Sequence, residues 1–508
     1  MASTPHFRIG TRGSDLAQWQ ARHVRDLIQS KGGSCEIIIL STQGDREQVQ
    51  AFEKLEGKGF FTKEIEQALL ENKVDLAVHS HKDLETIQPE GLTIAAVPQR
   101  ANPTDVLLIH PDAHALRPWL PLPKNAKVGT SSVRRRDQLL LLRPDLDIQA
   151  LRGNVPTRIE RLREKKYDAI VLASAGIERL DLNLGDLIKV ELNPRWFVPA
   201  PAQGALALQM RSKDPQLRWL QALSNKEAEG NIEMERSVLR ALEGGCQLPF
   251  GAHHSPGENG LRCFLQSSLG PLRVVAKDSL SALERLANPS SQRILITRTP
   301  RGSDVLKRLA QATTSALIEW PVARPKPSET DLEPMWNGAS PNWVWLGSPG
   351  AVTMALPWLH DHPNARIAVP GSGTASALPS ALQGRIGHCG TGDPKAAWRS
   401  FAQSLGTDDH VAIPHSSHSL KRWTETPCAA HLHSWVHYEL EAASETPPDF
   451  DVVCFTSPSN VELWTWPPPS KIVAIGKTTS RSLTQKGWSH IVASQPDAFG
   501  LWEAIEEA

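Results

Sequence analysis

Several features that would define a class of protein are missing from this sequence. Its six cysteines are scattered without any CxxC pair, so neither a disulfide framework nor a zinc site is expected, and a reducing, cytoplasmic environment is favoured. Lysine plus arginine balance aspartate plus glutamate at 55 each, so a general binder of nucleic acid or of membrane surfaces is not expected. No apolar run could span a bilayer, and Met1–Arg8 contains no apolar signal region. We therefore expect a soluble, monomeric protein with no metal, nucleic-acid or membrane partner.

The length of 508 residues exceeds what one hydrophobic core organises, so several domains are expected. Short β-branched runs alternate with helical patterns along the whole chain, which is typical of α/β architecture. Ser14 is predicted to cap a helix, and Thr62 to start another. The predicted strands of the first half lie near 8–10, 37–40, 74–78, 92–97, 127–129, 147–150 and 169–173. Helices are expected at 216–224 and 231–242.

The region after a polar linker near 288–291 contains a weak internal duplication. Residues 345–352, WLGSPGAV, resemble 454–461, CFTSPSNV, and residues 366–374 resemble 471–479 in the same way. Each copy is predicted to be a strand, a turn of small residues and the start of a helix. This pattern predicts two α/β lobes with a cleft between them.

Six arginines of the first half lie in short loops rich in Gly, Ser and Thr, at predicted strand ends where α/β proteins build their sites. They are Arg12, Arg134, Arg135, Arg152, Arg158 and Arg179. Arginine recognises carboxylates through two parallel hydrogen bonds, and hydroxyls at Ser14, Ser131 and Ser132 could add anion contacts at helix N-termini. A single arginine is more simply a solvated surface charge, but six in such loops favour an anion site.

Three further features suggest chemistry in the first half. Cys246 follows two glycines on a predicted bend, where a thiol is either a small buried hydrophobe or a presented reactive group. Asp83, in His79-Ser80-His81-Lys82-Asp83, is either a helix cap or an acid/base or cation-stabilising carboxylate. Lys54 opens a glycine-broken basic loop that lacks the upstream glycine of a Walker motif. A thiol, a carboxylate and an arginine cluster together indicate covalent handling of a polyanion.

These motifs together closely resemble the porphobilinogen deaminase (hydroxymethylbilane synthase) family over about residues 6–285. The motifs are TRGS, GKGFFTKEIEQALLENKVDLAVHSHKD, GTSSVRRR, LRGNVPTR, YDAIVLASAGIERL and LEGGCQLPFG. The resemblance implies two periplasmic-binding-protein-like α/β domains, 1–101 plus 197–215 and 102–196. It also implies a small α+β domain at 216–288 that carries the cofactor cysteine.

The resemblance also implies an activity and its residues. The family joins four porphobilinogen units into hydroxymethylbilane, releasing ammonia, on a dipyrromethane primer linked to a cysteine that matches Cys246. Its catalytic aspartate matches Asp83. The cofactor-binding positions match Lys82, Asp83, Ser131, Ser132, Arg134 and Arg135, and the substrate-binding positions match Arg12, Ser14, Lys54, Arg152, Arg158 and Arg179. A growing chain of acetate- and propionate-bearing pyrroles needs such a distributed set of cations.

The sequence departs from the family pattern at three places. Glu85 stands where proline is usual, Ala202 stands where glycine is usual, and Gln209-Met210 replaces a typical Ile-Glu pair. We expect these changes to affect loop rigidity and packing more than the charged site.

The second half is similar to the uroporphyrinogen-III synthase family over about 292–508, through RILITR, the paired Ser-Pro turns and AIGKTT. That resemblance implies lobes at 292–323 plus 440–508 and at 324–439. It also implies cyclisation of hydroxymethylbilane with inversion of the last ring. Thr478 and Tyr438 fall on catalytic-like positions and Ser457 and Ser459 on substrate-binding ones, although turn formation is the alternative interpretation for each.

The two resemblances together predict a bifunctional enzyme of tetrapyrrole synthesis. Two alternatives remain open from the sequence. One is a two-lobed protein that only binds an anionic ligand, for which Cys246 would have no purpose. The other is an active deaminase whose second half is a degenerate partner-binding module.

Overall fold

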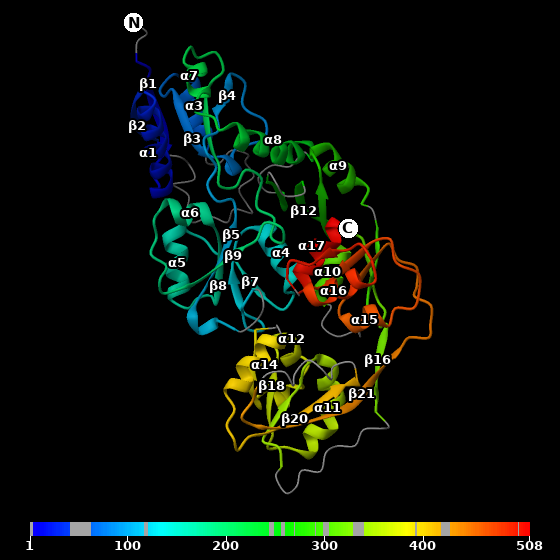
Figure 1. Ribbon diagram of the computed structural model, residues 1–508. Helices are drawn as coiled ribbons and strands as arrows, with labels where there is room; N and C mark the ends of the chain where they lie inside the picture. Colours follow the sequence, from blue (N-terminus) through cyan, green and yellow to red (C-terminus); the bar gives the residue numbers. More distant parts are fainter. Residues whose placement is uncertain are drawn as a thin grey trace. The chain divides into compact units, whose positions relative to one another are not determined.

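A computed structural model describes most of the chain. The described residues are 4–40, 62–115, 120–242, 248–255, 260–268, 270–289, 291–297, 304–328, 340–391, 394–417, 427–495 and 497–508. Contacts group them into two compact units, chiefly Met1–Gln292 with Ser303–Ala316, and Arg293–Gly302 with Leu317–Glu506. Among these residues no helix is both long and apolar enough to cross a lipid bilayer. The fold is α/β, with several mixed and parallel sheets (Figure 1).

The first sheet of the first unit has the order β2-β1-β3-β10-β4. Its strands are β1 (His6–Arg12), β2 (Ser34–Leu40), β3 (Leu76–Ser80), β4 (Leu92–Ala96) and β10 (Leu206–Arg211). Strands β1, β2 and β3 are parallel, whereas β10 runs antiparallel between β3 and β4. Helices α1 (Asp15–Ser30) and α3 (Lys63–Leu70) contact this sheet, and α1 buries Ala21, Val24 and Ile28. The predicted helix after Ser14 is confirmed, because the Ser14 hydroxyl accepts a hydrogen bond from the Ala17 amide.

The second sheet has the order β7-β6-β8-β5-β9. Its strands are β5 (Asp105–Ile109), β6 (Lys127–Gly129), β7 (Asp147–Gln149), β8 (Ala169–Ala173) and β9 (Ile188–Leu192), with helices α4 (Val133–Leu142), α5 (Val155–Arg163) and α6 (Ser174–Arg179). Strand β6 is parallel to β7 and β8, and β5 is antiparallel to β8 and β9. Each of the two sheets therefore has parallel strands that end at one edge and an antiparallel strand beside them.

The third part of this unit is a small α+β layer. Strands β11 (Phe250–His254), β12 (Leu261–Ser267) and β13 (Gly270–Ala276) form an antiparallel sheet. Helices α8 (Lys226–Ala241) and α9 (Ser279–Ala287) pack on it through a shared apolar cluster. The short helix α7 (Leu217–Gln221) packs against β4, and α10 (Asp304–Ala312) packs against α4.

The chain passes from the second sheet to β10 through a tight turn at 199–205. Ala202 is fully buried in this turn with φ = 61°, a left-handed conformation that favours glycine. Gly204 has φ = 85°, and a Cβ there would lie 2.5 Å from the carbonyl oxygen of Ala101. The alanine at 202 therefore occupies a backbone position that suits the glycine usual in the resembling family, whereas Gly204 has no room for any side chain.

The second unit contains two further sheets. One has the order β15-β14-β22-β23-β24, built from β14 (Arg293–Ile296), β15 (Ala316–Glu319), β22 (Val452–Phe455), β23 (Ile472–Ala474) and β24 (Ile491–Val492). The other has the order β16-β21-β20-β17-β18-β19, built from β16 (Ala323–Pro327), β17 (Trp343–Trp345), β18 (Arg366–Val369), β19 (Ile386–Cys389), β20 (His410–Ser416) and β21 (His431–Ala442). In this six-stranded sheet β16 pairs antiparallel with β21, and the other neighbouring strands pair in parallel.

The predicted internal duplication of this unit is confirmed by equivalent local structures. The first pair of similar segments gives β17 followed by α11 (Pro349–Asp361) and β22 followed by α15 (Pro458–Glu462). Ser348 caps α11 and Ser457 caps α15, each with proline at the start of the helix. The second pair gives β18 before α12 (Ser372–Ala375) and β23 before α16 (Lys477–Gln485). Helices α13 (Ser380–Gln383), α14 (Pro394–Gln403) and α17 (Ala498–Glu507) complete the unit.

Candidate active site

The cationic residues of the first unit gather because parallel strands end at the same edge of a sheet. Arg12 ends β1, and Lys82 follows the neighbouring parallel strand β3. In the second sheet, α4 with Arg134 and Arg135 follows β6, and Arg152 follows β7. The carboxyl ends of parallel strands are where open α/β sheets build their binding sites.

A cleft of about 110 Å³ is lined by residues from both sheets. Its charged lining consists of Lys82, Arg135, Arg158 and Arg179, and its remaining lining comes from α1, β3, β8, α5, α6 and the turn at Gly204. A larger hollow lies along α5 and Leu182, but among its lining residues only Arg163 is a cation. The cleft that four cations share is therefore the better candidate for an anion site.

Burial weakens the protonation of these cations. Burial, opposed by Asp83 and reinforced by Arg135, lowers the pKa of Lys82 to about 8. Burial is also the largest cause that lowers the pKa of Arg158 and of Arg179 to about 10. Cations that have lost water but keep their charge near neutral pH gain strongly from an anionic ligand. The cleft is therefore suited to carboxylates.

Asp83 lies next to these cations. It ends the 3-10 turn η2 (His81–Asp83), which begins directly after β3, and its side chain is exposed. Its negative charge raises the pKa of the adjacent Lys82. An exposed carboxylate beside two buried and two half-buried cations can interact with a positive charge that forms in a bound molecule.

Asp105 is the buried counter-ion of the arginine pair, and the sequence analysis did not identify it. Its carboxylate is fully buried and accepts hydrogen bonds from Arg134 Nη2 at 2.8 Å and from Arg135 Nε and Nη2 at 3.0 and 2.7 Å. Burial alone would raise the pKa of Asp105, but Arg134, Arg135 and Gln203 lower it to about 2. The sequence signal was an aspartate opening the apolar strand Asp-Val-Leu-Leu-Ile, where a charge must be paired.

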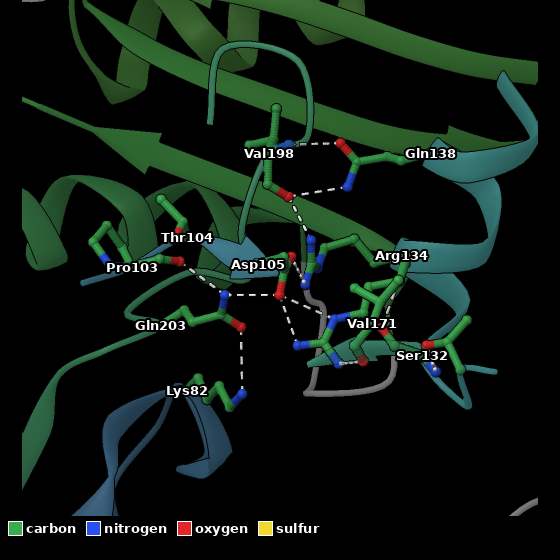
Figure 2. Close-up of polar contacts among 12 residues, drawn as sticks. Lys82, Pro103, Thr104, Asp105, Ser132, Arg134, Gln138, Val171, Val198 and Gln203 are labelled. Carbon is green, nitrogen blue, oxygen red and sulfur yellow. Dashed lines mark hydrogen bonds and ion pairs between the residues drawn. The ribbon is translucent and has the colours of Figure 1, made fainter. Parts of the chain in front are cut away.

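Gln203 connects the two sheets across this cluster, as Figure 2 shows. Its amide nitrogen donates to Asp105 Oδ1 at 3.0 Å and to the Pro103 carbonyl at 2.8 Å, and its oxygen accepts from Lys82 Nζ at 3.3 Å. Arg134 also donates to the Val198 carbonyl, and Arg135 to that of Val171. Lys82 is thus linked to the arginine pair through the side chains of Gln203 and Asp105.

The other predicted arginines lie around this cluster in different ways. Arg179 is buried, donates to the Gly204 carbonyl at 2.7 Å and lies 5.8 Å from the ring of Trp19. Arg158 donates to the Gly153 carbonyl at 2.6 Å, and Arg152 is exposed at the start of the same loop.

The predicted serines have local partners. Ser14 and Ser132 cap α1 and α4, respectively. The Ser131 hydroxyl donates to the Leu151 carbonyl and accepts from its amide. Lys54 and Cys246 lie outside the described residues; the five cysteines that are described, Cys35, Cys263, Cys389, Cys428 and Cys454, are free thiols.

The predicted residues of the second unit lie on two different sheets. Tyr438, on β21, is buried, and its hydroxyl lies 3.4 Å from the Ser348 hydroxyl at the start of α11. Burial raises the pKa of Tyr438. Ser457 and Ser459 follow β22, and the exposed Thr478 follows the neighbouring parallel strand β23. These last three residues share the carboxyl edge of one sheet, while Tyr438 belongs to the other.

The fold and the cleft define an α/β protein whose first unit has a cationic cleft, suited to an anionic ligand, at the carboxyl ends of two sheets. Residues 7–219 match the family model of the porphobilinogen deaminase, dipyromethane cofactor binding domain. A porphobilinogen deaminase of Nitratidesulfovibrio vulgaris is 45% identical over 249 residues, covering 48% of this chain and 76% of the relative. That of Syntrophotalea carbinolica is 38% identical over 327 residues, 62% of this chain and 99% of the relative. The chain belongs to the porphobilinogen deaminase family.

A solved structure adds a weaker likeness. The uroporphyrinogen-III synthetase of Helicobacter pylori is 15% identical and covers 42% of this chain and 99% of its own, with a TM-score of 0.30. A likeness at this level does not assign a function to the second unit, which is therefore considered from its own residues.

Proposed function

We propose that the first unit joins four porphobilinogen molecules head to tail into hydroxymethylbilane, releasing one ammonia at each addition. The observation that carries this proposal is the cleft that Lys82, Arg135, Arg158 and Arg179 line together. Each pyrrole brings an acetate and a propionate, so the lengthening product needs cations spread over two sheets. Family membership and the matched cofactor-binding domain support the same reaction.

The residues of the cleft fit a dipyrromethane cofactor. Its carboxylates would be held by Lys82 and by Arg135, with Arg134 fixed behind them through Asp105. The cofactor, joined to Cys246 by a thioether, would supply the pyrrole end that starts the chain. Holding that end in place turns each coupling into a reaction at high effective concentration.

Asp83 is assigned the role of stabilising charge. Loss of ammonia from porphobilinogen leaves a cationic carbon that a pyrrole then attacks, and the accessible Asp83 carboxylate would lie against the N–H groups of that cation. Arg12, Ser14, Arg152, Arg158 and Arg179, together with Lys54, would hold substrate carboxylates around it.

Intact-mass measurement of the purified chain tests the covalent cofactor. We expect added mass equal to two linked pyrroles, absent from Cys246→Ser. Active protein without this mass would refute the assignment, and a chain that binds anions without turnover would instead be a binding protein.

For Asp83→Asn we expect a folded protein that retains the added mass but has almost no chain extension. Normal turnover by this variant would remove Asp83 from the mechanism.

For the second unit we propose cyclisation of hydroxymethylbilane to uroporphyrinogen III, with inversion of the last ring. The support is the sequence resemblance, together with two sheets whose duplicated Ser-Pro turns open α11 and α15. Helix N-termini present unpaired amides, which suit the carboxylates of a linear tetrapyrrole. Thr478 and Tyr438 are the proposed catalytic residues, and Ser457 and Ser459 are proposed to bind substrate.

Analysis of the product isomers tests this second activity. Formation of the type III isomer supports it, whereas a product that is only type I would mean that the second unit is a partner-binding module.

Fusion would also raise the local concentration of the unstable linear intermediate. If so, two separated halves mixed at equal activity should yield more type I isomer than the intact chain. The proposed setting is a monomer in the cytoplasm, in keeping with the free thiols of the described cysteines.

A further inference from the structure

Arg236, on α8, holds the turn that carries Lys82 and Asp83. Its side chain is only 3% exposed. Nη1 donates to the carbonyls of His81 at 3.0 Å and Leu84 at 3.3 Å, and Nη2 donates to those of Leu84 at 3.2 Å and Glu85 at 2.7 Å. One planar guanidinium thus fixes the backbone on both sides of Asp83, because its donors lie in a rigid fork.

The turn is also held by hydrogen bonds of its own backbone, but the buried side chain of His81 adds no hydrogen bond among the described residues. The His81 amide donates to the Ala205 carbonyl at 3.0 Å, and the Leu84 amide donates to the His81 carbonyl at 3.3 Å. The His81 ring is buried, and neither ring nitrogen has a hydrogen-bond partner among the described residues. After Asp83, the carbonyls of Leu84 and Glu85 are held by Arg236.

Helix α8 is itself held firmly through the preceding residue, Glu235. This carboxylate is fully buried, accepts two hydrogen bonds from Arg100 at 2.7 and 2.9 Å, and accepts from the amides of Ala202 at 2.7 Å and His254 at 3.0 Å. Three of these charge-assisted hydrogen bonds come from Arg100 and Ala202, which adjoin strands of the first sheet, and the fourth comes from His254 on β11. Arg236 therefore projects from a helix that is fixed relative to the first sheet.

We propose that Arg236 is a positioning residue that sets the Asp83 carboxylate beside the cleft that Lys82 lines. The inference rests on the proposed role of Asp83 in the deaminase reaction. Because these four hydrogen bonds of Arg236 go to backbone carbonyls, its replacement displaces the turn of Asp83 without removing a group that is assigned to substrate binding. Displacement of a reacting group by about 1 Å can cost about 100-fold in rate.

The test compares Arg236→Lys with a matched control, Arg143→Lys. Arg143 is also buried, at 7% exposure, and donates to the carbonyls of Leu120, Leu122 and Pro123 at 3.0 to 3.3 Å. It also donates from Nε and Nη2 to the Asp145 carboxylate, at 2.7 Å in each case. Lysine keeps the charge in both variants but not the planar fork. Thermal unfolding, the intact mass of the loaded protein, and kcat and KM for porphobilinogen are measured for both.

We expect Arg236→Lys to lower kcat by about 10- to 100-fold with little change in KM and with the cofactor mass retained. Arg143→Lys should lose similar thermal stability and keep its kcat. An Arg236→Lys protein with the kcat of the wild type, or with a loss matched by Arg143→Lys, would overturn the inference.

A double mutant separates positioning from general damage. The rate of the first pyrrole addition is followed by intact mass. It should be the same in Asp83→Asn and in Asp83→Asn/Arg236→Lys, because the two substitutions remove the same function, that of the Asp83 carboxylate. A further 10-fold loss in the double mutant would contradict the inference. If Asp83→Asn is slow and Arg236→Lys is not, only the inference fails; if Asp83→Asn is as fast as the wild type, the proposed role of Asp83 fails with it.

Discussion

Asp105 is shared by both buried arginines of α4, and Asp105→Asn tests how strongly the first unit depends on that charge. The substitution keeps the size of the side chain but removes its negative charge. It also brings an NH2 group towards donors that now point at Asp105 from Arg134, Arg135 and Gln203. Two guanidinium groups would then be buried without their counter-ion.

The magnitude follows from the pKa and from the burial. The pKa of Asp105 is about 2 instead of 3.8. Each pKa unit corresponds to about 1.4 kcal/mol, so the native fold favours the charged form by about 2 kcal/mol. Removing one partner of a fully buried ion pair typically costs about 3–5 kcal/mol, because the remaining charge is unpaired. We therefore expect Asp105→Asn to lower the free energy of unfolding of the first unit by about 2–5 kcal/mol.

Hydrogen exchange measured by mass spectrometry in increasing urea is the appropriate assay, because a chain of two units need not unfold in one step. Peptides that cover β5 and α4 report on the first unit alone. Asp75→Asn is the control: Asp75 also has a pKa of about 2, with Arg8 and Arg211 as partners, but it is 19% exposed and does not line the cleft. Asp75→Asn should destabilise the fold by less than Asp105→Asn does and should leave kcat/KM unchanged. Asp105→Asn should lower both the free energy of unfolding and kcat/KM, because Arg135 lines the cleft.

The pH dependence gives a second check. Because the folded-state pKa of Asp105 lies below the unfolded value, its contribution is complete above about pH 4 and is lost as the pH falls towards 2. The difference between wild type and Asp105→Asn should shrink over that range. If the two proteins exchange alike at pH 7, or if their difference persists at pH 2, the charge of Asp105 does not stabilise the arginine pair.

Three further predictions follow from other contacts. Since the pKa of Lys82 is about 8, its ammonium loses its proton as the pH rises through 8, and KM for porphobilinogen should rise there. In steady-state assays, Lys82→Arg should keep KM constant up to about pH 9.5, because arginine stays charged. Gly204→Ala should abolish folding or lower the free energy of unfolding by more than about 3 kcal/mol, because its Cβ would collide with a carbonyl oxygen. Gly230→Ala is the control: it lies in open space within α8 and should raise the free energy of unfolding by about 1 kcal/mol in urea titrations. Asn460→Ala should destabilise the second unit by about 1–3 kcal/mol, because the carbonyl and hydroxyl of buried Thr297 lose a donor; unchanged thermal unfolding would contradict this.

Local patterns predicted the parallel parts of the fold well. Strands β6 and β8 and the start of α1 were located from β-branched runs and from the capping serine, because these signals depend only on neighbouring residues. Strands β5, β9 and β10 of these two sheets were not predicted. Of these, β5 and β10 run antiparallel to both of their neighbours, and each enters its sheet from a proline-containing turn. Their place is determined by partners distant in the sequence, which a local pattern does not contain.

The candidate site divides in a similar way. The motifs identified Lys82, Asp83 and the arginines, and the structure places Arg158 and Arg179 beside Lys82 in one cleft. They did not identify the groups behind these cations, since Asp105 and Gln203 are about 30 and 70 residues away from α4. Nor did they show that Asp105 binds both Arg134 and Arg135, or that only Arg135 of this pair also lines the cleft.

The sequence by itself determined that this chain carries a set of cations, an aspartate and a cysteine suited to a polyanionic substrate, because side-chain chemistry is fixed by residue type. It also predicted several strands and helix starts, because capping and alternation are local. Only the tertiary structure decided which cations share a cleft, which carboxylate balances the arginine pair, and which helix holds the turn of Asp83. Those outcomes depend on burial and on hydrogen bonds between distant segments, and both arise only when the sheets and α8 come together.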